Sequence, residues 1–469
     1  MANDLLGVID IGKTHARLFT AESGQGVLST SRYTIRGAIE SPIIRELDVR
    51  GIESWLIETL RSHPQRDRIG AIVPIAHGAA AVLIDAEGNV LLAPDYEDAR
   101  FDEVAEAYRP LRDPFHLTYS PFLPLGLNLG RQLFYLKSRA PEVLARTHQL
   151  LLYPQFWAWR LSSTAASEVT SLACHSDLWH PLARCPSDLA AKQRWTAWIP
   201  SLRAASEVLG TISGTMTEKT GLNTDCRILT GLHDSNASFL AHLANRRERP
   251  FVLISSGTWT ILMARGVDPT RIREHLDMLI NIDATGTPVA TARFMGGREY
   301  EVITGKAGLQ VAPSLDDLPA LLGGEVLALP SFSRAGGPFP GVQGQLIRAD
   351  ALTARQRTTL ASVYLALMTD YVLELMGVEC DLIIDGPLAK NSVYAEVLSC
   401  LRPHANVLLS QGCASAVTAA SVLCNISPVE QQYTSTRSYA YHKRLEVYRS
   451  VWREAAALHA NYPFSQAAT

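Results

Sequence analysis

Residues 7–14, with the sequence GVIDIGKT, have the residue types and the spacing of a nucleotide phosphate site. The two glycines, Lys13 and Thr14 complete a Walker A pattern, in which backbone N–H groups of a glycine-rich loop bind phosphates and the lysine reaches the terminal ones. The same residues match an apolar strand that ends in Asp10 and Gly12 and continues into a hairpin turn. Both interpretations place a phosphate beside Gly12, but they require different folds.

The local pattern favours the hairpin. A Walker A pattern requires a loop between its glycines, but three of the four residues there are apolar and β-branched, which is typical of a strand. A Walker A helix should also begin after Thr14. Residues 16–20 instead largely alternate between apolar and polar side chains. A cluster of turn-forming residues follows at positions 23–26. We therefore expect a β-hairpin and no P-loop.

The composition excludes several classes of protein. The chain has 469 residues, which predicts two or more domains, and its formal net charge is −3 with both signs scattered. We expect no nucleic-acid partner, because a basic patch is missing, and no membrane partner, because no run of about 18 uncharged apolar residues occurs. The first residues lack the basic region of a signal peptide, and the seven cysteines show no paired spacing. Both observations predict a cytoplasmic protein with reduced thiols.

Cys174, His175, His180 and Cys185 form a cluster that could be mistaken for a metal site. Their spacing fits no common zinc pattern. We therefore expect an ordinary loop here rather than structural zinc.

The chain divides into two halves of similar plan. The first half opens with the hairpin, followed by a helix near residues 52–61 and a buried strand at residues 69–75. The second half begins after a charged break at residues 245–250 and also opens with a strand and a small-residue turn. The order then repeats as an answering strand, a long helix and a buried strand, at residues 259–263, 355–376 and 380–384. We therefore predict two domains, residues 1–247 and residues 248–469.

The motifs of both halves together resemble the FGGY carbohydrate kinases. In chain order they are Asp10-x-Gly12-x-Thr14, His77-Gly78, Gly231-x-His233-Asp234, Ser256-Gly257-Thr258 and Gly386-x-x-Ala389-x-Asn391. Each motif is weak alone, but the series covers essentially the whole chain. The resemblance implies an α/β fold of two actin-like, ribonuclease H-like domains, with ATP and a sugar in the cleft between them. It implies that residues 1–247 hold the sugar site and the catalytic base, and that residues 248–469 hold the nucleotide site. It also implies phosphorylation of a small sugar by ATP with Mg²⁺, as in ketose kinases of the xylulose type, and homodimers are common in that family.

Two turns, one from each half, have the composition of a phosphate site. Tight glycine turns expose backbone N–H groups that can hold phosphate oxygens. Threonine hydroxyls can add donors, and Lys13 and Arg17 can add positive charge near a transferring phosphoryl group. The alternative is that both are ordinary hairpin turns. We expect nucleotide binding at Gly12, Lys13, Thr14, Arg17, Gly257 and Thr258.

Two acidic residues are candidates for the chemistry. Asp10 ends the first buried strand beside the phosphate turn, where a carboxylate can bind magnesium through water or can simply cap the turn. Asp234 lies in a small-residue loop that opens a helix, where it can be an N-cap or can accept the proton of a sugar hydroxyl. The residues alone do not decide between these two roles of Asp234, whereas the resemblance favours Asp234 as the general base.

The resemblance also implies ligand contacts elsewhere. It gives His77 a sugar hydroxyl as its partner, although a core or turn histidine is the alternative. Ser235 is a second candidate for the sugar, and Gln155 is a third, in an aromatic stretch that can wall the site or belong to the core. For the nucleotide we expect contacts at Gly296, Gly386, Ala389 and Asn391.

The chain departs from the family pattern at two informative positions. Lys13 stands where threonine is common, so it either holds a phosphate or only turns the hairpin. Pro387 stands where a second glycine is usual, and because proline lacks a backbone N–H, we expect one nucleotide contact to be lost.

Two other classes of protein stay open at this stage. A Walker A NTPase would need an acidic residue for magnesium at the end of another strand, and Asp385 is the candidate. A non-catalytic sugar-sensing protein of the actin-like fold would need no base, whereas the acid at Asp234 is present. We expect an ATP-dependent kinase of a ketose such as xylulose.

Overall fold

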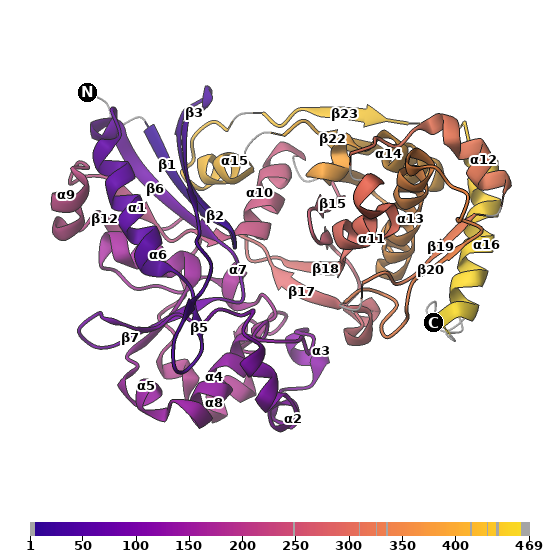
Figure 1. The fold of residues 1–469 in the computed structure, drawn as a ribbon. Coiled ribbons are helices and arrows are strands. Elements are labelled where there is room, and N and C mark those ends of the chain that lie inside the picture. Colours follow the sequence, from indigo (N-terminus) through magenta and orange to yellow (C-terminus); the bar gives the residue numbers. More distant parts are fainter. Residues whose placement is uncertain are drawn as a thin grey trace. The chain divides into compact units, whose positions relative to one another are not determined.

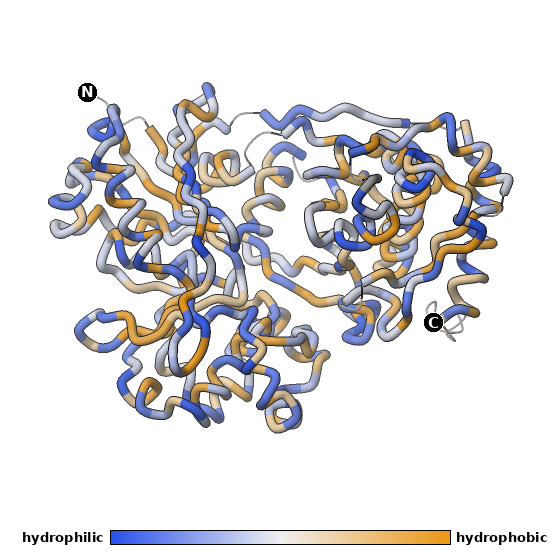
Figure 2. Tube along the Cα trace, viewed as in Figure 1, coloured by the Kyte–Doolittle hydropathy of each residue, from blue (hydrophilic) through white to orange (hydrophobic). Residues whose placement is uncertain are grey.

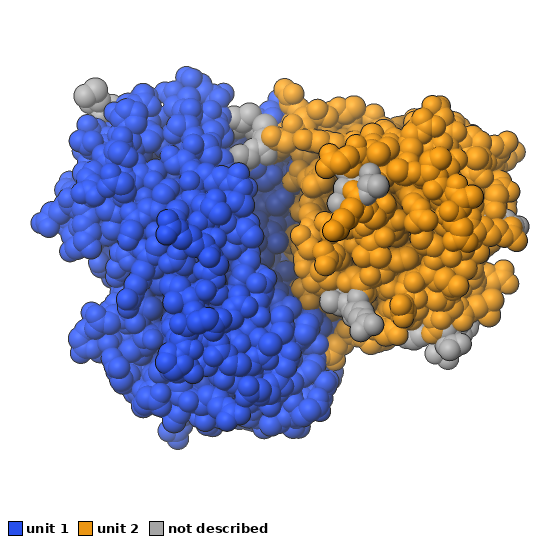
Figure 3. All heavy atoms as spheres, in the orientation of Figure 1, with its two compact units in different colours: residues 1–247, 280–288, 413–430 blue, residues 248–279, 289–412, 431–469 orange. Residues whose placement is uncertain are grey.

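The computed structural model describes residues 5–246, 249–308, 310–324, 326–333, 336–412, 415–428, 430–437 and 440–460. The chain forms two compact units (Figure 3). Unit 1 comprises Met1–Arg247, Ile280–Pro288 and Cys413–Glu430, and unit 2 comprises Glu248–Leu279, Val289–Gly412 and Gln431–Thr469. The units are not contiguous in the sequence, because residues 280–288 and 413–430 group with unit 1. The predicted cleft between the halves stays a prediction.

The centre of unit 1 is a mixed sheet with strand order β12-β13-β6-β1-β2-β3, in which β14 also pairs with β6 (Figure 1). The strands β1, β6, β13 and β14 are parallel, whereas β2 and β3 continue from β1 as an antiparallel meander. The bounds are β1 Leu5–Ile11, β2 His15–Glu22, β3 Gly26–Thr34, β6 Ile69–Ala76, β12 Val208–Thr211, β13 Arg227–Leu229 and β14 Leu232–His233.

The hairpin interpretation of the opening residues is confirmed. The chain turns at residues 12–14, where Gly12 N donates to His15 O at 2.9 Å, and the answering segment is a strand rather than the helix that a P-loop requires. Gly7 lies inside β1, where an added Cβ would lie 3.2 Å from Ile72 of the neighbouring strand. Its match to the Walker A pattern therefore has no structural counterpart.

The alternation of β1 explains why both faces of the sheet are covered. Leu5, Ile9 and Ile11 belong to a core cluster with helices α1, α6 and α9, whereas Leu6 and Val8 belong to one with α10 and α15. The hydropathy colouring shows the corresponding orange stretches in the strands, and mostly blue turns (Figure 2). The helix bounds are α1 Val49–Ser62, α6 Tyr153–Ser162, α9 Gly214–Thr220, α10 Asp234–Arg246 and α15 Ser415–Leu423.

A second layer of unit 1 contains the segment between the strand β6 and the helix α8. Its three-stranded sheet, β8-β7-β9, packs with short helices around a separate core cluster that includes Phe101, Leu133 and Trp195. The strand bounds are β7 Ala81–Ile84, β8 Val90–Leu92, β9 Gln149–Leu152, β10 Trp179–His180 and β11 Cys185–Pro186, with the small pair β4 Ile39–Glu40 and β5 Arg45–Glu46. The helix bounds are α2 Ala105–Tyr108, α3 Phe115–Thr118, α4 Leu129–Arg139, α5 Pro141–Arg146, α7 Val169–Leu172 and α8 Asp188–Lys192.

The sheet of unit 2, in which residues 280–282 and 288 are grouped with unit 1, repeats the plan of the first one. Its order is β17-β18-β16-β15-β21-β22-β23, so an antiparallel hairpin, β15 and β16, again lies beside a parallel strand, β21. The strand bounds are β15 Phe251–Ser256, β16 Thr260–Arg265, β17 Met278–Ile282, β18 Pro288–Phe294, β21 Asp381–Asp385, β22 Val407–Ser410 and β23 Tyr433–Thr436, with the pair β19 Leu327–Leu329 and β20 Gln345–Ile347. The repeated order expected from the sequence is therefore present in both sheets.

Helix α13, Ala354–Met376, is the core helix of unit 2. A capping box of Thr353 and Gln356 begins it, and Gly377 in the left-handed conformation ends it. By length and composition it could cross a membrane, but 94% of its apolar window is buried within the described protein, as expected of a core helix. The other helices of this unit are α11 Gly296–Gly308, α12 Leu318–Gly323, α14 Ser392–Leu401 and α16 His442–Ala460.

Candidate active site

Three parallel strands of unit 1 end side by side, and each leads into predicted site residues. The register aligns Ile11 of β1 with Ala76 of β6, and Ala76 with His233 of β14. The carboxyl edge of parallel strands is the common ligand site of α/β sheets. This edge brings together Asp10, Gly12, Lys13, Thr14, His77, Asp234 and Ser235 from three separate parts of the chain.

Asp10 and Asp234 form an electrostatically linked pair at this edge. Burial is the main cause that raises the pKa of Asp10 to about 6, the charge of Asp234 adds to it, and Arg17 opposes both. Arg17 lies directly opposite Asp10 on β2 and donates from Nη1 to Asp10 Oδ2 at 3.3 Å. Arg17, predicted to bind phosphate, is therefore the counterion of Asp10 here. The negative charges of two neighbouring carboxylates repel each other, and a cation bound between them relieves this repulsion.

The donor set fits a magnesium ion that is held mainly by its substrate. Within the described ranges, no group of three or more His, Cys, Asp or Glu side chains is arranged to hold a metal. Mg²⁺ keeps several waters and commonly uses one or two carboxylates together with substrate phosphates. Asp10, partly exposed beside the turn at residues 12–14, can supply such a carboxylate.

His77 presents a hydrogen-bond acceptor at the same edge. Its Nδ1 donates to Gly78 O at 3.0 Å, and burial lowers the pKa of the ring, so the neutral form with a lone pair on Nε2 is favoured. The ring contacts Tyr96 and Tyr153, at centroid distances of 5.6 and 4.9 Å. A neutral imidazole with a fixed tautomer is suited to accept a hydrogen bond from a hydroxyl.

Asp234 begins helix α10 but does not cap it in the usual way. Its Oδ1 accepts from the next residue, from Ser235 N at 2.6 Å and Ser235 Oγ at 3.3 Å, rather than from an N–H two or three residues on. The side chain is 37% exposed, and no donor among the described residues reaches Oδ2. One carboxylate oxygen is held and the other can receive a proton. Ser235, predicted as a sugar contact, orients Asp234 in this structure.

Gln155 lies in the core of unit 1. Its side chain is fully buried in α6, and Nε2 donates to Thr230 O and Gly231 O, each at 3.2 Å. The aromatic stretch around Gln155 packs in the core of unit 1, which favours the second of the two roles expected for it, and the sugar contact stays a prediction. Gln155 instead holds the loop that leads into Asp234.

Replacing Gln155 by leucine should destabilise unit 1 and spare the sugar site. Two buried carbonyls would lose their donor, which costs about 1–3 kcal/mol. Urea denaturation should report that loss, while the sugar KM changes by less than about twofold. The surface variant Gln193→Leu is the control, because Gln193 only accepts from Lys137. A tenfold rise in KM with unchanged stability would restore Gln155 to the sugar site.

A buried network behind Asp234 was not expected from the sequence. His233 N donates to Thr170 Oγ1 at 3.0 Å, and Thr170 N donates to Glu168 at 2.9 Å. His233 Nε2 lies 3.7 Å from Cys174 Sγ, and although burial acts against it, the charges of Cys174 and Asp234 raise the pKa of His233 to about 9. His233 stood inside the quoted Gly-x-His-Asp motif, so the motif was the available signal.

Gly78 is needed for this network. A Cβ at Gly78 would lie 2.4 Å from His233 Nε2 and 3.4 Å from Cys174 Sγ. The His77-Gly78 and His233-Asp234 motifs therefore interlock. Cys174 belongs to this contact, whereas His180 pairs with Asp113 at 2.6 Å, so the cysteine–histidine cluster of the sequence is divided between two networks.

In unit 2, the predicted phosphate turn after β15 is approached closely by other backbone segments. Gly257 N donates to Trp259 O at 2.9 Å and closes the hairpin. An added Cβ at Gly297 would lie 2.2 Å from Gly257 O, and one at Gly386 would lie 2.2 Å from Ser256 O. Three segments thus meet more closely than side chains would permit, around an exposed glycine–threonine turn.

The remaining predicted nucleotide residues differ in their surroundings. Gly296 is buried, and a Cβ there would lie 2.2 Å from Thr260 Oγ1, so packing requires this glycine. Asn391 caps α14 by accepting from Tyr394 N at 2.9 Å, which occupies its side-chain oxygen. Ala389 is half-buried in the short turn after Gly386. Pro387 begins that turn, where a missing N–H costs the fold nothing.

Comparison with known proteins places the chain in a family. Residues 248–433 match the family model described as carbohydrate kinase FGGY, C-terminal domain. The crystal structure of a carbohydrate kinase from Novosphingobium aromaticivorans matches 96% of this chain and 100% of its own, at 32% identity and a TM-score of 0.88. The chain belongs to the FGGY family of carbohydrate kinases. The predicted resemblance and the α/β fold class are confirmed.

More distant members of the FGGY family carry specific names. The rhamnulokinase of Halalkalibacterium halodurans is 21% identical over 285 residues, a match that spans 57% of this chain and only 58% of that protein. Plasmodium falciparum glycerol kinase with ADP shares the fold at 12% identity and a TM-score of 0.77, covering 97% of this chain and 98% of its own. Structures named as gluconate and xylulose kinases share it at 12 to 18% identity.

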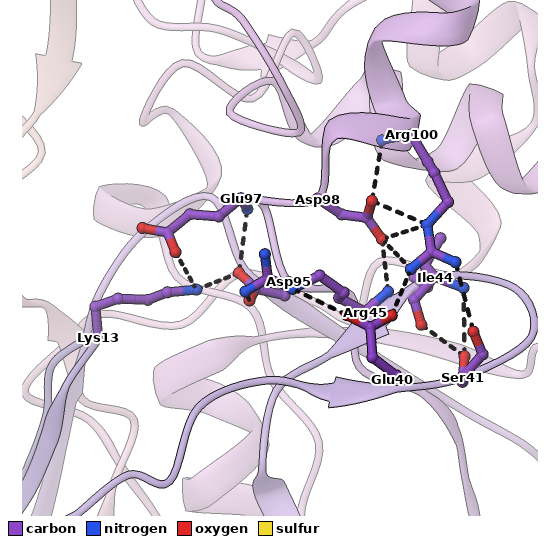
Figure 4. Close-up of polar contacts among 9 residues, drawn as sticks. All are labelled: Lys13, Glu40, Ser41, Ile44, Arg45, Asp95, Glu97, Asp98 and Arg100. Atoms are coloured by element: carbon purple, nitrogen blue, oxygen red, sulfur yellow. Dashed lines mark hydrogen bonds and ion pairs between the residues drawn. The ribbon is translucent and has the colours of Figure 1, made fainter.

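Lys13 is engaged away from the phosphate turn of this FGGY-family chain. Its ammonium pairs with Asp95 and lies 3.5 Å from Glu97 Oε2 (Figure 4). It also lies over the ring of Tyr96, 4.6 Å from the centroid. The Lys13 ammonium is thus already paired in this structure, and phosphate binding by Lys13 stays a prediction. No local pattern in the sequence links Lys13 to residues 95–97.

Proposed function

We propose that the protein transfers the γ-phosphoryl group of ATP to a hydroxyl of a small sugar, and that the sugar is a ketose such as xylulose. The observation that carries the proposal is the meeting of His77, Asp234 and the Gly12 turn at one strand edge, in a chain of the FGGY carbohydrate kinase family. The names rhamnulokinase and xylulose kinase support a ketose, because both denote keto sugars.

The residues of unit 1 suffice for the acceptor half of the reaction. Asp234 accepts the hydroxyl proton through its free carboxylate oxygen as the sugar oxygen attacks the γ-phosphorus. The bond to the β–γ bridging oxygen breaks, and ADP leaves with that electron pair. His77 accepts a hydrogen bond from a second hydroxyl and orients the sugar. Ser235 keeps Asp234 in position throughout.

Charge on the phosphates is compensated by backbone donors and a metal ion. Glycine turns at residues 12–14 and 257–258 offer N–H groups to phosphate oxygens. Bound Mg²⁺, with Asp10 as its protein carboxylate, would neutralise the developing charge on these oxygens. The described cysteines are free thiols, which supports a cytoplasmic location.

The test is phosphoryl transfer from radiolabelled ATP to a panel of acceptors, with and without magnesium. The panel should contain D-xylulose, L-rhamnulose, glycerol and D-gluconate. We expect magnesium-dependent transfer to a ketose. Transfer to no acceptor would overturn the kinase proposal: ATP hydrolysis alone would favour an NTPase, and sugar binding without transfer would favour a sensing protein.

A further inference from the structure

We propose that Lys13 is a specificity-determining residue of the acceptor site, where its ion pair with Asp95 fixes Tyr96 against His77 as one wall of the sugar pocket. The inference rests on the proposed function and deepens it, since it moves Lys13 from the phosphate side to the sugar side of the reaction. It also assigns the segment of residues 95–98 to substrate recognition.

The charge of Lys13 is already compensated. Its ammonium bonds to Asp95, and Glu97 lies within 3.5 Å. Asp95 is itself buried, so losing its partner would leave a carboxylate in a site of low dielectric. A lysine in this position is a weak phosphate ligand, because each phosphate contact would compete with a buried ion pair.

Asp95 anchors the segment through both carboxylate oxygens. Its Oδ1 accepts from Lys13 and from Glu97 N at 3.1 Å, and its Oδ2 accepts from Arg45 Nη2 at 3.2 Å (Figure 4). The backbone joins in, because Asp95 N donates to Arg45 O at 2.9 Å. Lys13 thus connects the turn at residues 12–14 to the segment of residues 95–98 in the second layer of unit 1.

The far end of the segment is fixed independently of Lys13. Asp98 accepts from Arg45 N at 2.6 Å and binds the Arg100 guanidinium, which also reaches Glu40 at 3.1 Å. Gly126 N donates to Tyr96 O at 2.8 Å. Removing Lys13 should therefore loosen the Tyr96 side chain without unfolding the segment.

Tyr96 is the residue that this arrangement presents to the site. Its ring meets the ring of His77 edge to face, with centroids 5.6 Å apart, and packs under the Lys13 ammonium. Burial and then the charges of Glu97 and Asp234 raise the pKa of Tyr96, so its hydroxyl stays protonated and can donate to a sugar oxygen. This wall of the sugar pocket fits an uncharged sugar. The Lys13 ammonium is already paired and therefore does not offer its charge to the carboxylate of a sugar acid.

The experiment separates sugar binding from nucleotide binding. Titration calorimetry with D-xylulose, L-rhamnulose, D-gluconate and MgADP should be run on the wild-type protein, Lys13→Met, Lys13→Arg and Asp95→Asn. We expect Lys13→Met and Asp95→Asn to raise the ketose Kd at least about tenfold, and Lys13→Arg by less than about threefold. The MgADP Kd should change by less than about twofold. D-Gluconate should bind more weakly than the ketoses.

The controls address folding and the pairing itself. Lys137→Met removes a surface lysine that donates to Gln193, and it should leave both dissociation constants unchanged. Thermal melts should show that each variant folds. The double variant Lys13→Met with Asp95→Asn should lose no more sugar affinity than either single variant, because contacting residues are not additive.

Three outcomes would overturn the inference. They are a rise in the MgADP Kd with unchanged ketose binding, equal loss of both ligands, and additive losses in the double variant. A failure of the proposed function is distinguishable, because wild-type protein that binds the ketose but transfers no phosphate would refute catalysis while Lys13 still governs sugar affinity. D-Gluconate binding tighter than ketose would overturn the assignment to uncharged sugars.

Discussion

Replacing Asp234 by asparagine should lower kcat by a factor of about 10² to 10⁴ and leave the sugar Kd near its wild-type value. The amide has the shape of the carboxylate, and its oxygen can still accept the hydrogen bond from Ser235 N. It cannot accept the proton of an attacking hydroxyl. Stopped assays with a saturating ketose would measure kcat, and calorimetry with the same sugar would measure binding.

The matched control is Asp188→Asn, at the start of helix α8. Asp188 is also the first residue of a helix, but it is exposed and pairs only with Lys192 on the next turn. That variant should retain full activity, because exposed pairs of this kind contribute little. Wild-type kcat in the Asp234 variant would remove this residue from the role of general base.

Replacing Gly231 by alanine should be the most damaging single methyl addition in unit 1. Gly231 has φ of +74°, and its added Cβ would lie 2.0 Å from Pro74 O on the backbone of β6. Neither the strained backbone nor the strand can give way cheaply, so we expect a loss of about 3 kcal/mol or more in unfolding free energy. Because the same loop delivers Asp234, kcat should also fall about 10²-fold.

Gly214→Ala provides the comparison for that variant. Gly214 is the first residue of α9, and nothing lies within 4 Å of its added Cβ. Alanine is the better helix former, so this variant should be as stable as the wild type or slightly more stable. Denaturant titrations should therefore give a much lower midpoint for Gly231→Ala than for Gly214→Ala. Equal midpoints would show that the loop at Gly231 relaxes freely.

Local patterns in the sequence predicted the elements that carry the site. The β-branched residues between Gly7 and Gly12 determined a strand, because side-chain sterics act over neighbouring residues. The same reasoning found the second hairpin and the long core helix α13. The sequence also suggests that Asp10, His77 and Asp234 lie close together. Each comes at or near the end of a strand, and the carboxyl ends of parallel strands meet at one edge of the sheet.

Contacts between distant segments could not be predicted in this way. Lys13 and Asp95 are 82 positions apart, and no periodicity links them. The position of Gln155 depended on which face of α6 meets the loop at residues 230–231. Neither contact could be inferred from the local segment, because a side chain's partner is decided by tertiary packing.

The return of α15 to unit 1 has the same origin. Its small apolar residues, including Val417, Ala420 and Leu423, pack with Val8 and Leu240 on one face of the first sheet. The sequence shows an apolar helix there but does not say which sheet it covers. Two contiguous domains were the simplest expectation. Instead, the segment that contains α15 groups with unit 1 although it follows most of unit 2 in the sequence.

The interlocking of Gly78 with His233 has a consequence for how this site can change over time. A side chain at position 78 can be accommodated only if the residue at position 233 becomes smaller, since the two occupy the same space. Neither substitution alone leaves both the histidine and the base in place. A larger residue at position 78 should therefore be found only together with a smaller residue at position 233.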